Sequence, residues 1–584
     1  MLSFAGKPFS ARSYRRQTVG DAALCETSTP MNHALASVAT VIIVAICLST
    51  AGHLAGAEEV YKPNPKPPTD GRIGSNYTPA YAVNQVQFWH DFRPDVVDKE
   101  LAAASKYFGV STLRVYLHDI NFFQEKKVLL ANIEKFLTIC DKHGIKPGFV
   151  FFDGCHRHEG IFLDKPTEPV SGFHNSRWAQ SPQARDIDKD NLDKFKPYAQ
   201  EIIRAHRADD RVLFWEIHNE PPPGDEYRDR LKRAGYAWAK EVEPTQPVIN
   251  CEKGKRGWAD CTVTDIVDAH VYSHAHGPLR DLSDFNPEKG TVFTEAGARW
   301  KASRRNFGGP IDMIFWLQQR RREGKSTPGM YLCWELMAGN SNCRWHWIDK
   351  PGAAEPEIPW CGLLWPDATP VSLAEAAAVR RYTTGKSDAL FFEDFETHSA
   401  QAWKPYGKQN LPVRNAVTLE PGMKAVAGDK AWTNYVLEGR VVLRPGKEDA
   451  EPADAGLLFR VNDPGEDLDA MRGYGVTFNS KRLVLSKFDG GRREELEVFD
   501  LTRLKTDTRP NEWSMIRIAA TGARIRVWFN RMHPSVDPDR GLRIDFTDKK
   551  HPILSGAIGL RTDGVKAQFD NIVVLPADTL PELR

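Results

Sequence analysis

Two glutamates end short apolar segments and could form a pair of catalytic carboxylates. Residues 210–221 (DRVLFWEIHNEP) are rich in strand-forming side chains and end in Asn219-Glu220, which prolines follow directly. Residues 291–297 (TVFTEAG) place Glu295 just before a turn in the same way. Both patterns are typical of buried strands whose C-terminal ends present a carboxylate. Hydrolysis of a glycosidic bond needs two such groups, because one protonates the leaving oxygen while the other attacks or activates water.

Strands and helices are predicted to alternate from residue 71 to residue 387. Strands are expected within 71–84, 112–118, 146–153, 210–220, 247–252, 265–272, 291–295 and 329–335, and helices within 97–108, 128–143, 195–208, 228–243, 311–323 and 373–383. Eight strands alternating with helices favour a parallel (β/α)8 TIM barrel, in which catalytic residues lie at the C-terminal ends of the strands. The alternation also fits an open doubly wound sheet, but no glycine-rich phosphate loop follows the first strand.

The order of polar and aromatic residues along this barrel resembles that of a known class of enzymes. The residues are Arg114, Asn219-Glu220-Pro221, His270-x-Tyr272, Glu295 and Trp334. This order is similar to that of the clan A glycoside hydrolases and, within them, of the cellulase-like family 5. The resemblance implies a retaining, double-displacement mechanism with Glu220 as general acid/base and Glu295 as nucleophile. Their carboxyl groups would then lie about 5 Å apart, rather than the roughly 6.5–9.5 Å of an inverting enzyme.

The resemblance also implies roles for residues near the nucleophile. Arg114 would hold Glu295 in its anionic form, and Tyr272 would donate a hydrogen bond to the same carboxylate. His270 would line the sugar site, and Trp334 would form an aromatic floor under the sugar. Arg114 could equally belong to a structural salt bridge of the barrel, because a charged residue in an apolar strand is rarely without a partner.

Further polar groups near the predicted carboxylates leave alternatives open. The Asn219 amide could hydrogen-bond the 2-hydroxyl of a sugar, a contact that strengthens in the transition state, or it could only satisfy backbone groups. The run His270, Tyr272, His274, His276 could suggest a metal site. Neutral sugars need no metal, and no carboxylate lies at ligand spacing within the run. We therefore expect neither a metal nor another cofactor.

Two long loops on the catalytic side of the barrel should set specificity. Residues 152–158 extend the third strand, and the polar, aromatic stretch 173–182 precedes the fourth. Loops at this face of a barrel carry most substrate contacts. Asp153, His174 and Trp178 are therefore predicted to contact substrate.

The pattern changes from about residue 389 to the C-terminus. Helical periodicity gives way to short alternating runs separated by turn residues, which favours an antiparallel sandwich over residues 388–584. The opening Phe392-Glu393-Asp394-Phe395 and the closing segment 556–574 resemble concanavalin A-like, laminin G-like jelly rolls. Such modules often bind glycans, although the domain could instead only pack on the barrel.

The first 57 residues are predicted to be a signal peptide. An apolar run covers residues 34–51, and Ala55-Gly56-Ala57 is typical of a cleavage site. The basic region lies far upstream, so translation could begin at Met31, and the run could also be retained as a membrane anchor. Residues 58–70 are rich in proline and are predicted to be an extended linker. The protein is therefore expected to be exported.

Seven cysteines follow residue 57. If the protein is exported, some of them could form disulfides in an oxidising environment. Cys251 with Cys261 and Cys333 with Cys343 are plausible disulfides, but sequence alone cannot fix the connectivity. The formal net charge is +1, which implies no nucleic acid or other polyanion as a partner. The oligomeric state stays open.

These observations predict a secreted retaining glycoside hydrolase with a C-terminal sandwich domain. Its expected substrate is a β-linked polysaccharide or oligosaccharide of gluco or manno type. Two alternatives remain at this stage. The chain could be a non-catalytic carbohydrate-binding protein on a glycosidase-like barrel, or a glycosidase acting on another glycan such as a β-galactoside.

Overall fold

The computed structural model describes most of the chain after residue 70. The described ranges are 71–155, 160–165, 167–251, 261–272, 289–299, 309–356, 358–407, 410–446, 453–504, 511–531, 533 and 535–580. The predicted signal peptide, the predicted linker, His274 and His276 lie outside them. The chain from Pro63 to Arg584 forms one compact unit.

The first part of this unit is a closed barrel of eight parallel strands, in sequence order around the barrel. The strands are β1 (Arg72–Asn76), β2 (Thr112–Tyr116), β3 (Lys146–Asp153), β4 (Phe214–Asn219), β5 (Val248–Cys251), β6 (Val267–Val271), β7 (Thr291–Ala296) and β8 (Met330–Cys333). Pairing of β1 with β8 closes the ring, so the fold is the predicted barrel and not an open sheet.

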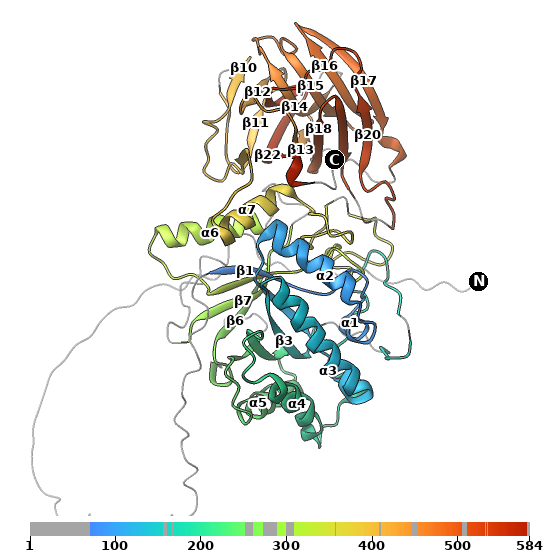
Figure 1. The fold of residues 1–584 in the computed structure, drawn as a ribbon, viewed down its shortest axis with the longest axis vertical. Coiled ribbons are helices and arrows are strands. Elements are labelled where there is room, and N and C mark those ends of the chain that lie inside the picture. The colour runs from blue at the N-terminus through green and yellow to red at the C-terminus, as the bar shows by residue number, and fades with distance from the viewer. Residues whose placement is uncertain are drawn as a thin grey trace, which may run out of the picture. The chain divides into compact units, whose positions relative to one another are not determined.

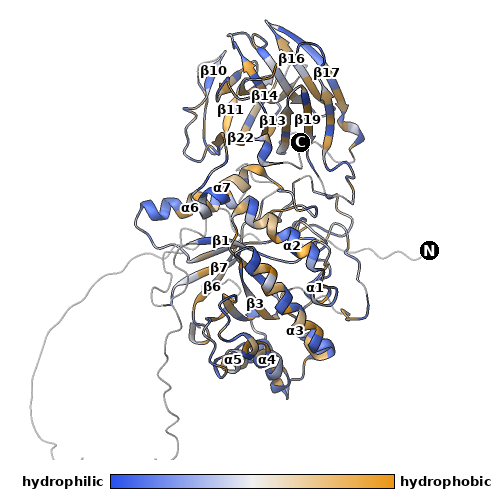
Figure 2. Cartoon of the chain, viewed as in Figure 1, coloured by the Kyte–Doolittle hydropathy of each residue, from blue (hydrophilic) through white to orange (hydrophobic). Residues whose placement is uncertain are grey.

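Helices cover the outside of the barrel (Figure 1). They are α1 (Gln85–His90), α2 (Pro94–Ala103), α3 (Asp119–Lys142), α4 (Lys196–His206), α5 (Glu226–Lys240), α6 (Pro310–Arg322) and α7 (Leu373–Thr384). Hydrophobic and hydrophilic residues alternate along α3 (Figure 2), as expected of a helix with one face on the strands. Helix α3 begins nine residues earlier than the apolar spacing predicts. The His118 side chain caps it by accepting from the Ile120 amide, and the helix is kinked at Glu125.

The barrel interior is layered from apolar to polar. Its lower part is filled by a cluster made of Phe214, Ile249, Ile266, Val292, Met330 and Leu332. The Phe214 ring lies over Gly148, where an added Cβ would come within 2.2 Å of it. Charged and polar side chains follow on the same strands toward their C-terminal ends. The interior therefore ends in a buried polar layer at the rim where catalytic residues of such barrels lie.

The C-terminal part is a sandwich of antiparallel sheets, as predicted (Figure 1). One sheet contains β10 (Lys404–Tyr406), β12 (Lys424–Ala427), β21 (Ala557–Asp563), β14 (Asp454–Asn462), β15 (Arg472–Phe478), β16 (Arg482–Asp489) and β17 (Arg492–Asp500). The other contains β11 (Val417–Leu419), β22 (Lys566–Pro576), β13 (Tyr435–Arg444), β18 (Ser514–Thr521), β19 (Arg524–Phe529) and β20 (Leu542–Thr547), and β9 (Phe391–Glu393) pairs with β22.

Alternate side chains of β13 serve two different cores. Tyr435, Leu437 and Val441 belong to the apolar cluster between the two sheets. Val436 points the other way, because side chains alternate along a strand, and it joins the hydrophobic core of the barrel. Ala519 of β18 and Val573 and Leu575 of β22 join that core as well. The outer face of β13, β18 and β22 thus packs partly against the barrel.

The predicted disulfides are wrong for the described cysteines. Cys251, Cys333 and Cys343 are all free and buried. The thiol of Cys343 instead donates to the Met337 carbonyl oxygen over 3.3 Å. Among the described residues, none of the helices combines the length and the apolar character needed to cross a lipid bilayer.

Candidate active site

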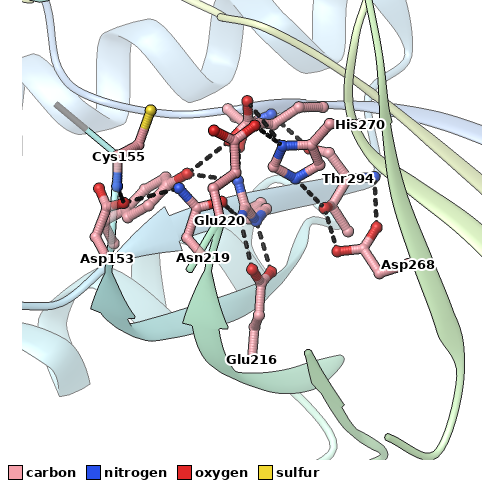
Figure 3. Close-up of polar contacts among 12 residues, drawn as sticks. Asp153, Cys155, Glu216, Asn219, Glu220, Asp268, His270 and Thr294 are labelled. Carbon is pink, nitrogen blue, oxygen red and sulfur yellow. Dashed lines mark hydrogen bonds and ion pairs between the residues drawn. The ribbon is translucent and has the colours of Figure 1, made fainter. Parts of the chain in front are cut away.

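The two predicted catalytic glutamates meet at the C-terminal rim of the barrel. Glu220 follows directly after β4, and Glu295 is the fifth residue of β7. An oxygen of each carboxylate and a ring nitrogen of His270 all lie within 4.8 Å of one another. Figure 3 shows Glu220 beside His270. Glu220 is 9% exposed and Glu295 6% exposed, so both retain some access to solvent. The two carboxylates are therefore close enough to act on one bound group.

Arg114 lies under this pair, and its fully buried guanidinium binds two carboxylates. Its Nε donates to Glu216 Oε2 over 2.7 Å, and its Nη1 donates to Glu295 Oε1 over 2.7 Å. It also donates to the Asn219 Oδ1 over 2.8 Å. Burial raises the pKa of Glu216 to about 7, although the positive charge of Arg114 opposes the rise. The arginine therefore combines the two roles left open by the sequence, the structural ion pair and the contact to the predicted nucleophile.

Three donors surround the carboxylate of Glu295. Arg114 and Tyr116 donate to Oε1, the tyrosine over 2.8 Å, and Tyr272 donates to Oε2 over 2.6 Å. Hydrogen bonds to the charged form of a carboxylate favour that form. The arrangement fits a group that must stay anionic to attack. Tyr116 was missed in the sequence, although it lies two residues after Arg114 and hence on the same face of β2.

His270 connects Glu220 to a second buried carboxylate. Its Nδ1 lies 2.7 Å from Glu220 Oε1, and its Nε2 lies 3.1 Å from Thr294 Oγ1 (Figure 3). The Thr294 hydroxyl donates to Asp268 Oδ2 over 2.6 Å, so it can only accept from His270. Nε2 therefore carries a hydrogen, and Nδ1 and Glu220 share a further proton between them. Neither Asp268 nor Thr294 was singled out in the sequence, but Asp268 lies two residues before His270 on one face of β6.

The charge around His270 favours its protonated form. Burial lowers the pKa of the imidazole, but the negative charge of Glu295 and the hydrogen bond to Glu220 outweigh it and raise the pKa to about 9. Burial also raises the pKa of Asp268, against the opposing charge of His270. A proton is thus held between Glu220 and His270 at neutral pH.

The backbone at Glu220 is strained. Its φ is 40°, in the left-handed region that residues other than glycine rarely adopt, and a proline follows. Gly154 makes room for this turn, because an added Cβ there would lie 2.6 Å from the Glu220 carbonyl oxygen. Such outliers persist only where surrounding structure fixes them, and they cluster at active sites.

Asp153 orients the Asn219 amide rather than facing open solvent. It is 1% exposed and accepts from Asn219 Nδ2 over 2.9 Å and from Trp178 Nε1 over 2.6 Å. With Arg114 donating to the amide oxygen, the two ends of the amide cannot exchange places. Burial raises the pKa of Asp153 to about 6, and these hydrogen bonds limit the rise. Direct contact of Asp153 and Trp178 with substrate stays a prediction.

Aromatic side chains form one wall of the site. Trp334 is 5% exposed, and its ring lies 6.1 Å from that of Tyr116, edge to face. Tyr272 stacks on Trp360 with centroids 6.0 Å apart, and Trp347 meets Trp360 edge to face at 4.4 Å. Trp347 is 42% exposed, so it can offer an open ring face. The sequence pointed to Trp334 but assigned no role to Trp360.

His174 contacts the aromatic wall through Trp360. It is buried, its Nδ1 contacts the Trp345 carbonyl oxygen at 2.8 Å, and its ring meets Trp360 edge to face. It therefore supports the loop after β8, and a direct contact with substrate stays a prediction.

Two triplets of possible metal ligands occur at the site, and both contain His270. One is Glu220, His270 and Glu295, and the other is Cys251, Asp268 and His270. Both nitrogens of His270 already have partners, in Glu220 and in Thr294. The contact between His270 and Glu220 could carry a proton between the two side chains.

The chain is similar to solved structures of low sequence identity. The exo-beta-1,4-mannosidase Op5Man5 from Opitutaceae bacterium strain TAV5 is 17% identical over 54% of this chain and 60% of its own, with a TM-score of 0.38. The endo-beta-1,4-mannanase from Thermotoga petrophila is 13% identical over 79% of this chain and 97% of its own, with a TM-score of 0.37. No curated protein matches the chain.

A further solved structure resembles part of the chain, and a family model matches residues of the sandwich. The carbohydrate-binding module CBM66 from Bacillus subtilis is 18% identical over 30% of this chain and 95% of its own, with a TM-score of 0.24. Residues 391–575 match the model of the 3-keto-alpha-glucoside-1,2-lyase-like domain. The chain thus joins a (β/α)8 barrel, with two glutamates at its rim, to a domain similar to that family.

Proposed function

We propose that the barrel is a retaining glycoside hydrolase that cleaves a β-glycosidic bond by double displacement. The observation that supports this proposal best is the approach of Glu220 and Glu295 to within 4.8 Å at the strand ends. Retaining enzymes hold their carboxyl groups about 5–5.5 Å apart, because one of them must reach the anomeric carbon. Inverting enzymes leave room for a water, which this spacing does not.

In the first step, Glu295 attacks the anomeric carbon while Glu220 protonates the leaving oxygen. Arg114, Tyr116 and Tyr272 donate to the Glu295 carboxylate and orient it for the attack. The proton shared by Glu220 and His270 moves to the leaving oxygen, and the bond between sugar and leaving group breaks. A covalent bond between sugar and Glu295 results.

In the second step, a water replaces the leaving group. Glu220, now ionised, takes a proton from this water, and the hydroxyl attacks the anomeric carbon. The bond to Glu295 breaks and the sugar is released with its configuration retained. The Glu220–His270 pair then again holds the proton that it began with.

The substrate that we propose is a β-linked polysaccharide or oligosaccharide of gluco or manno type. The Asn219 amide, fixed by Asp153 and Arg114, has a second N–H that suits a sugar 2-hydroxyl. Trp334 and the exposed Trp347 suit the flat C–H faces of such sugars. The apolar run and the cleavage motif before Glu58 support export of the enzyme to such a substrate.

The test is hydrolysis of β-glucans, mannans, xylans and aryl β-glycosides by the chain from Glu58 onward, with Glu295→Gln as the control. We expect turnover of one class with retention of configuration, and its loss in Glu295→Gln. Inverted product would contradict the double displacement. Glycan retained on an affinity gel without any turnover would favour a non-catalytic binding protein instead.

A further inference from the structure

A buried series of ion pairs links the sandwich to the segment that follows the proposed nucleophile. Arg440 of β13 donates through Nη2 to Glu375 Oε1 over 3.1 Å. Glu375, in the first turn of α7, also accepts from Arg299 Nε over 2.8 Å and from Arg299 Nη2. All three side chains are at most 3% exposed. Arg299 is the fourth residue after Glu295, so one carboxylate connects the two parts of the molecule.

Arg299 in turn fixes the loop that carries the aromatic wall. Its backbone N–H donates to the Trp360 carbonyl oxygen over 2.7 Å. Its Nη1 donates to the carbonyl oxygens of Pro359 and Gly362 over 3.1 and 2.9 Å. Three backbone carbonyls within four consecutive residues thus depend on this one arginine.

The same loop contacts the nucleophile through a tyrosine. The Trp360 ring stacks on Tyr272, whose hydroxyl donates to Glu295 over 2.6 Å. A shift of Arg299 would therefore move Trp360, and with it the ring that places one of the donors to Glu295. Displacements of about 1 Å far from the chemistry can cost on the order of 100-fold in rate.

A second buried pair at the same interface also contacts the start of α7, but its hydrogen bonds go to residues 370–374 and not to the side chains of Glu375 or Arg299. Glu438 of β13 accepts from the Leu373 and Ala374 amides over 2.7 and 3.3 Å and so caps the N-terminus of α7. Arg517 of β18 holds Glu438 over 2.7 Å. Arg517 is buried like Arg440, and it donates to Glu438 and to the carbonyl oxygens of Pro370 and Val371. The molecule thus offers a matched comparison.

We propose that Arg440 is a positioning residue for catalysis, so that the sandwich domain completes the active site of the barrel. Arg440 orients Glu375, Glu375 orients Arg299, and Arg299 holds the 359–362 loop against Tyr272. The expected effect on kcat rests on the proposed glycosidase function, whereas the expected effect on the 359–362 loop does not.

The test compares Arg440→Met, Arg440→Lys and Arg517→Met in the full chain from Glu58. Thermal unfolding is measured first, and kcat and KM on a soluble substrate are then measured well below the lowest unfolding midpoint. Hydrogen exchange is followed in a peptide covering residues 358–366. We expect Arg440→Met to lower kcat by about 10- to 100-fold with little change in KM and to speed exchange in this peptide. Arg440→Lys should restore part of kcat and part of the slow exchange. Arg517→Met should lower the unfolding midpoint but keep kcat within about twofold of the parent, because Arg299 stays in place.

Two results would overturn the proposal. One is unchanged exchange of residues 358–366 in Arg440→Met. The other is an equal loss of kcat in Arg517→Met, which would make the effect a general loss of interface stability. If the parent protein hydrolyses no glycan, the proposed function fails, whereas the exchange comparison still decides the coupling.

Discussion

Both the barrel and the sandwich bury charged residues on their strands, but they arrange them differently. In the sandwich, Arg561 of β21 pairs with Asp454, Asp469 and Asp563 over 3.0, 2.9 and 3.2 Å. Asp454 is further paired with Arg493 over 3.1 Å. Each of these three aspartates is thus paired with an arginine. In the barrel, by contrast, Glu220 and Glu295 converge with His270 on one point.

The difference separates a structural site from a reactive one. A balanced set of ion pairs holds strands together and gains nothing from a change in protonation. The barrel set gathers titratable groups whose pKa values are displaced, such as His270 at about 9, Glu216 at about 7 and Asp153 at about 6. Burial also raises the pKa of Glu396 in the sandwich to about 7. The convergence of the two glutamates with His270, rather than displaced pKa values alone, therefore distinguishes the barrel site. The comparison predicts that substitutions in the two regions will have different kinds of effect.

The largest effect is expected for Glu220→Gln. The amide keeps the shape of the side chain but cannot donate a proton to the leaving oxygen, so kcat on a natural glycan should fall by about 10²- to 10⁴-fold. An aryl glycoside with a good leaving group should lose less in the first step, because its leaving oxygen needs no proton. The control is Glu226→Gln, at an exposed position in α5. An equal loss on both substrates would contradict the assigned role.

A pair of arginine substitutions tests the comparison directly. Arg114→Met removes the cation from a fully buried ion pair, which should cost about 3–5 kcal/mol in the free energy of unfolding. Arg561→Met removes a buried cation whose acid partners are partly exposed, and Asp454 keeps Arg493, so a smaller loss of stability is expected. Only Arg114→Met also removes a donor to Glu295, and it should lower kcat by about 10²- to 10³-fold. Urea unfolding and steady-state kinetics measure the two effects. Loss of kcat in folded Arg561→Met would break the distinction between the regions.

Much of the barrel could be predicted from the sequence. Its strands show clear apolar runs, and the residues that end them lie at one rim of a parallel barrel. The bounds predicted for the third strand, 146–153, agree with β3. Arg114, Glu220 and Glu295 lie on separate strands, yet parallel strands in a barrel end on the same side, so their meeting follows from the fold. Tyr116 and Asp268 could have been found by the same rule, since each lies two positions from a residue already singled out.

Other features depend on contacts that no local pattern announces. Glu375 lies 76 positions from Arg299 and 65 from Arg440, and nothing in the helix that contains it distinguishes it from a surface acid. Residues of β13, β18 and β22 also share one hydrophobic core with the barrel, although these strands lie far from the barrel residues in the sequence. The disulfide predictions failed for a related reason, because cysteine spacing says nothing about which way two thiols point.

A smaller effect is expected in the pH dependence of His270→Gln. In the parent, loss of the proton shared by Glu220 and His270 should set the basic limb of kcat/KM, toward the pKa of about 9. Without the imidazole, Glu220 holds its proton alone, and the basic limb should move to lower pH. The measurement is kcat/KM from about pH 4 to 10. The control is His143→Gln, because His143 directly follows α3 and contacts Asp98 rather than a group of the proposed active site. A basic limb that stays in place would show that the proton is not shared.

The smallest expected effect concerns the pH dependence of stability. Its sign should be opposite for an acid of the barrel and an acid of the sandwich. Burial raises the pKa of Asp153 from 3.8 to about 6, so the folded protein binds this proton more tightly than the unfolded chain. The anion therefore costs stability, and the cost grows as pH rises from about 4 through 6. In Asp153→Asn this cost is absent, so the variant should gain on the order of 1–3 kcal/mol relative to the parent between about pH 4 and pH 7.

Asp548 of the sandwich gives the matching case. Burial would raise its pKa, but hydrogen bonds from Lys487 and Tyr474 outweigh this effect and lower the pKa below 3.8. Its anion stabilises the fold above that value, and the stabilisation is lost as pH falls through the folded pKa. Asp548→Asn should therefore lose stability relative to the parent as pH rises from about 3 to 5, opposite in sign to Asp153→Asn. Urea unfolding of both variants and the parent from about pH 3.5 to 7.5 measures the two slopes. If the free energy of unfolding of Asp153→Asn and of the parent changed with pH in parallel, ionisation of Asp153 would cost the folded protein no stability. This result would contradict the expected difference between Asp153 and Asp548.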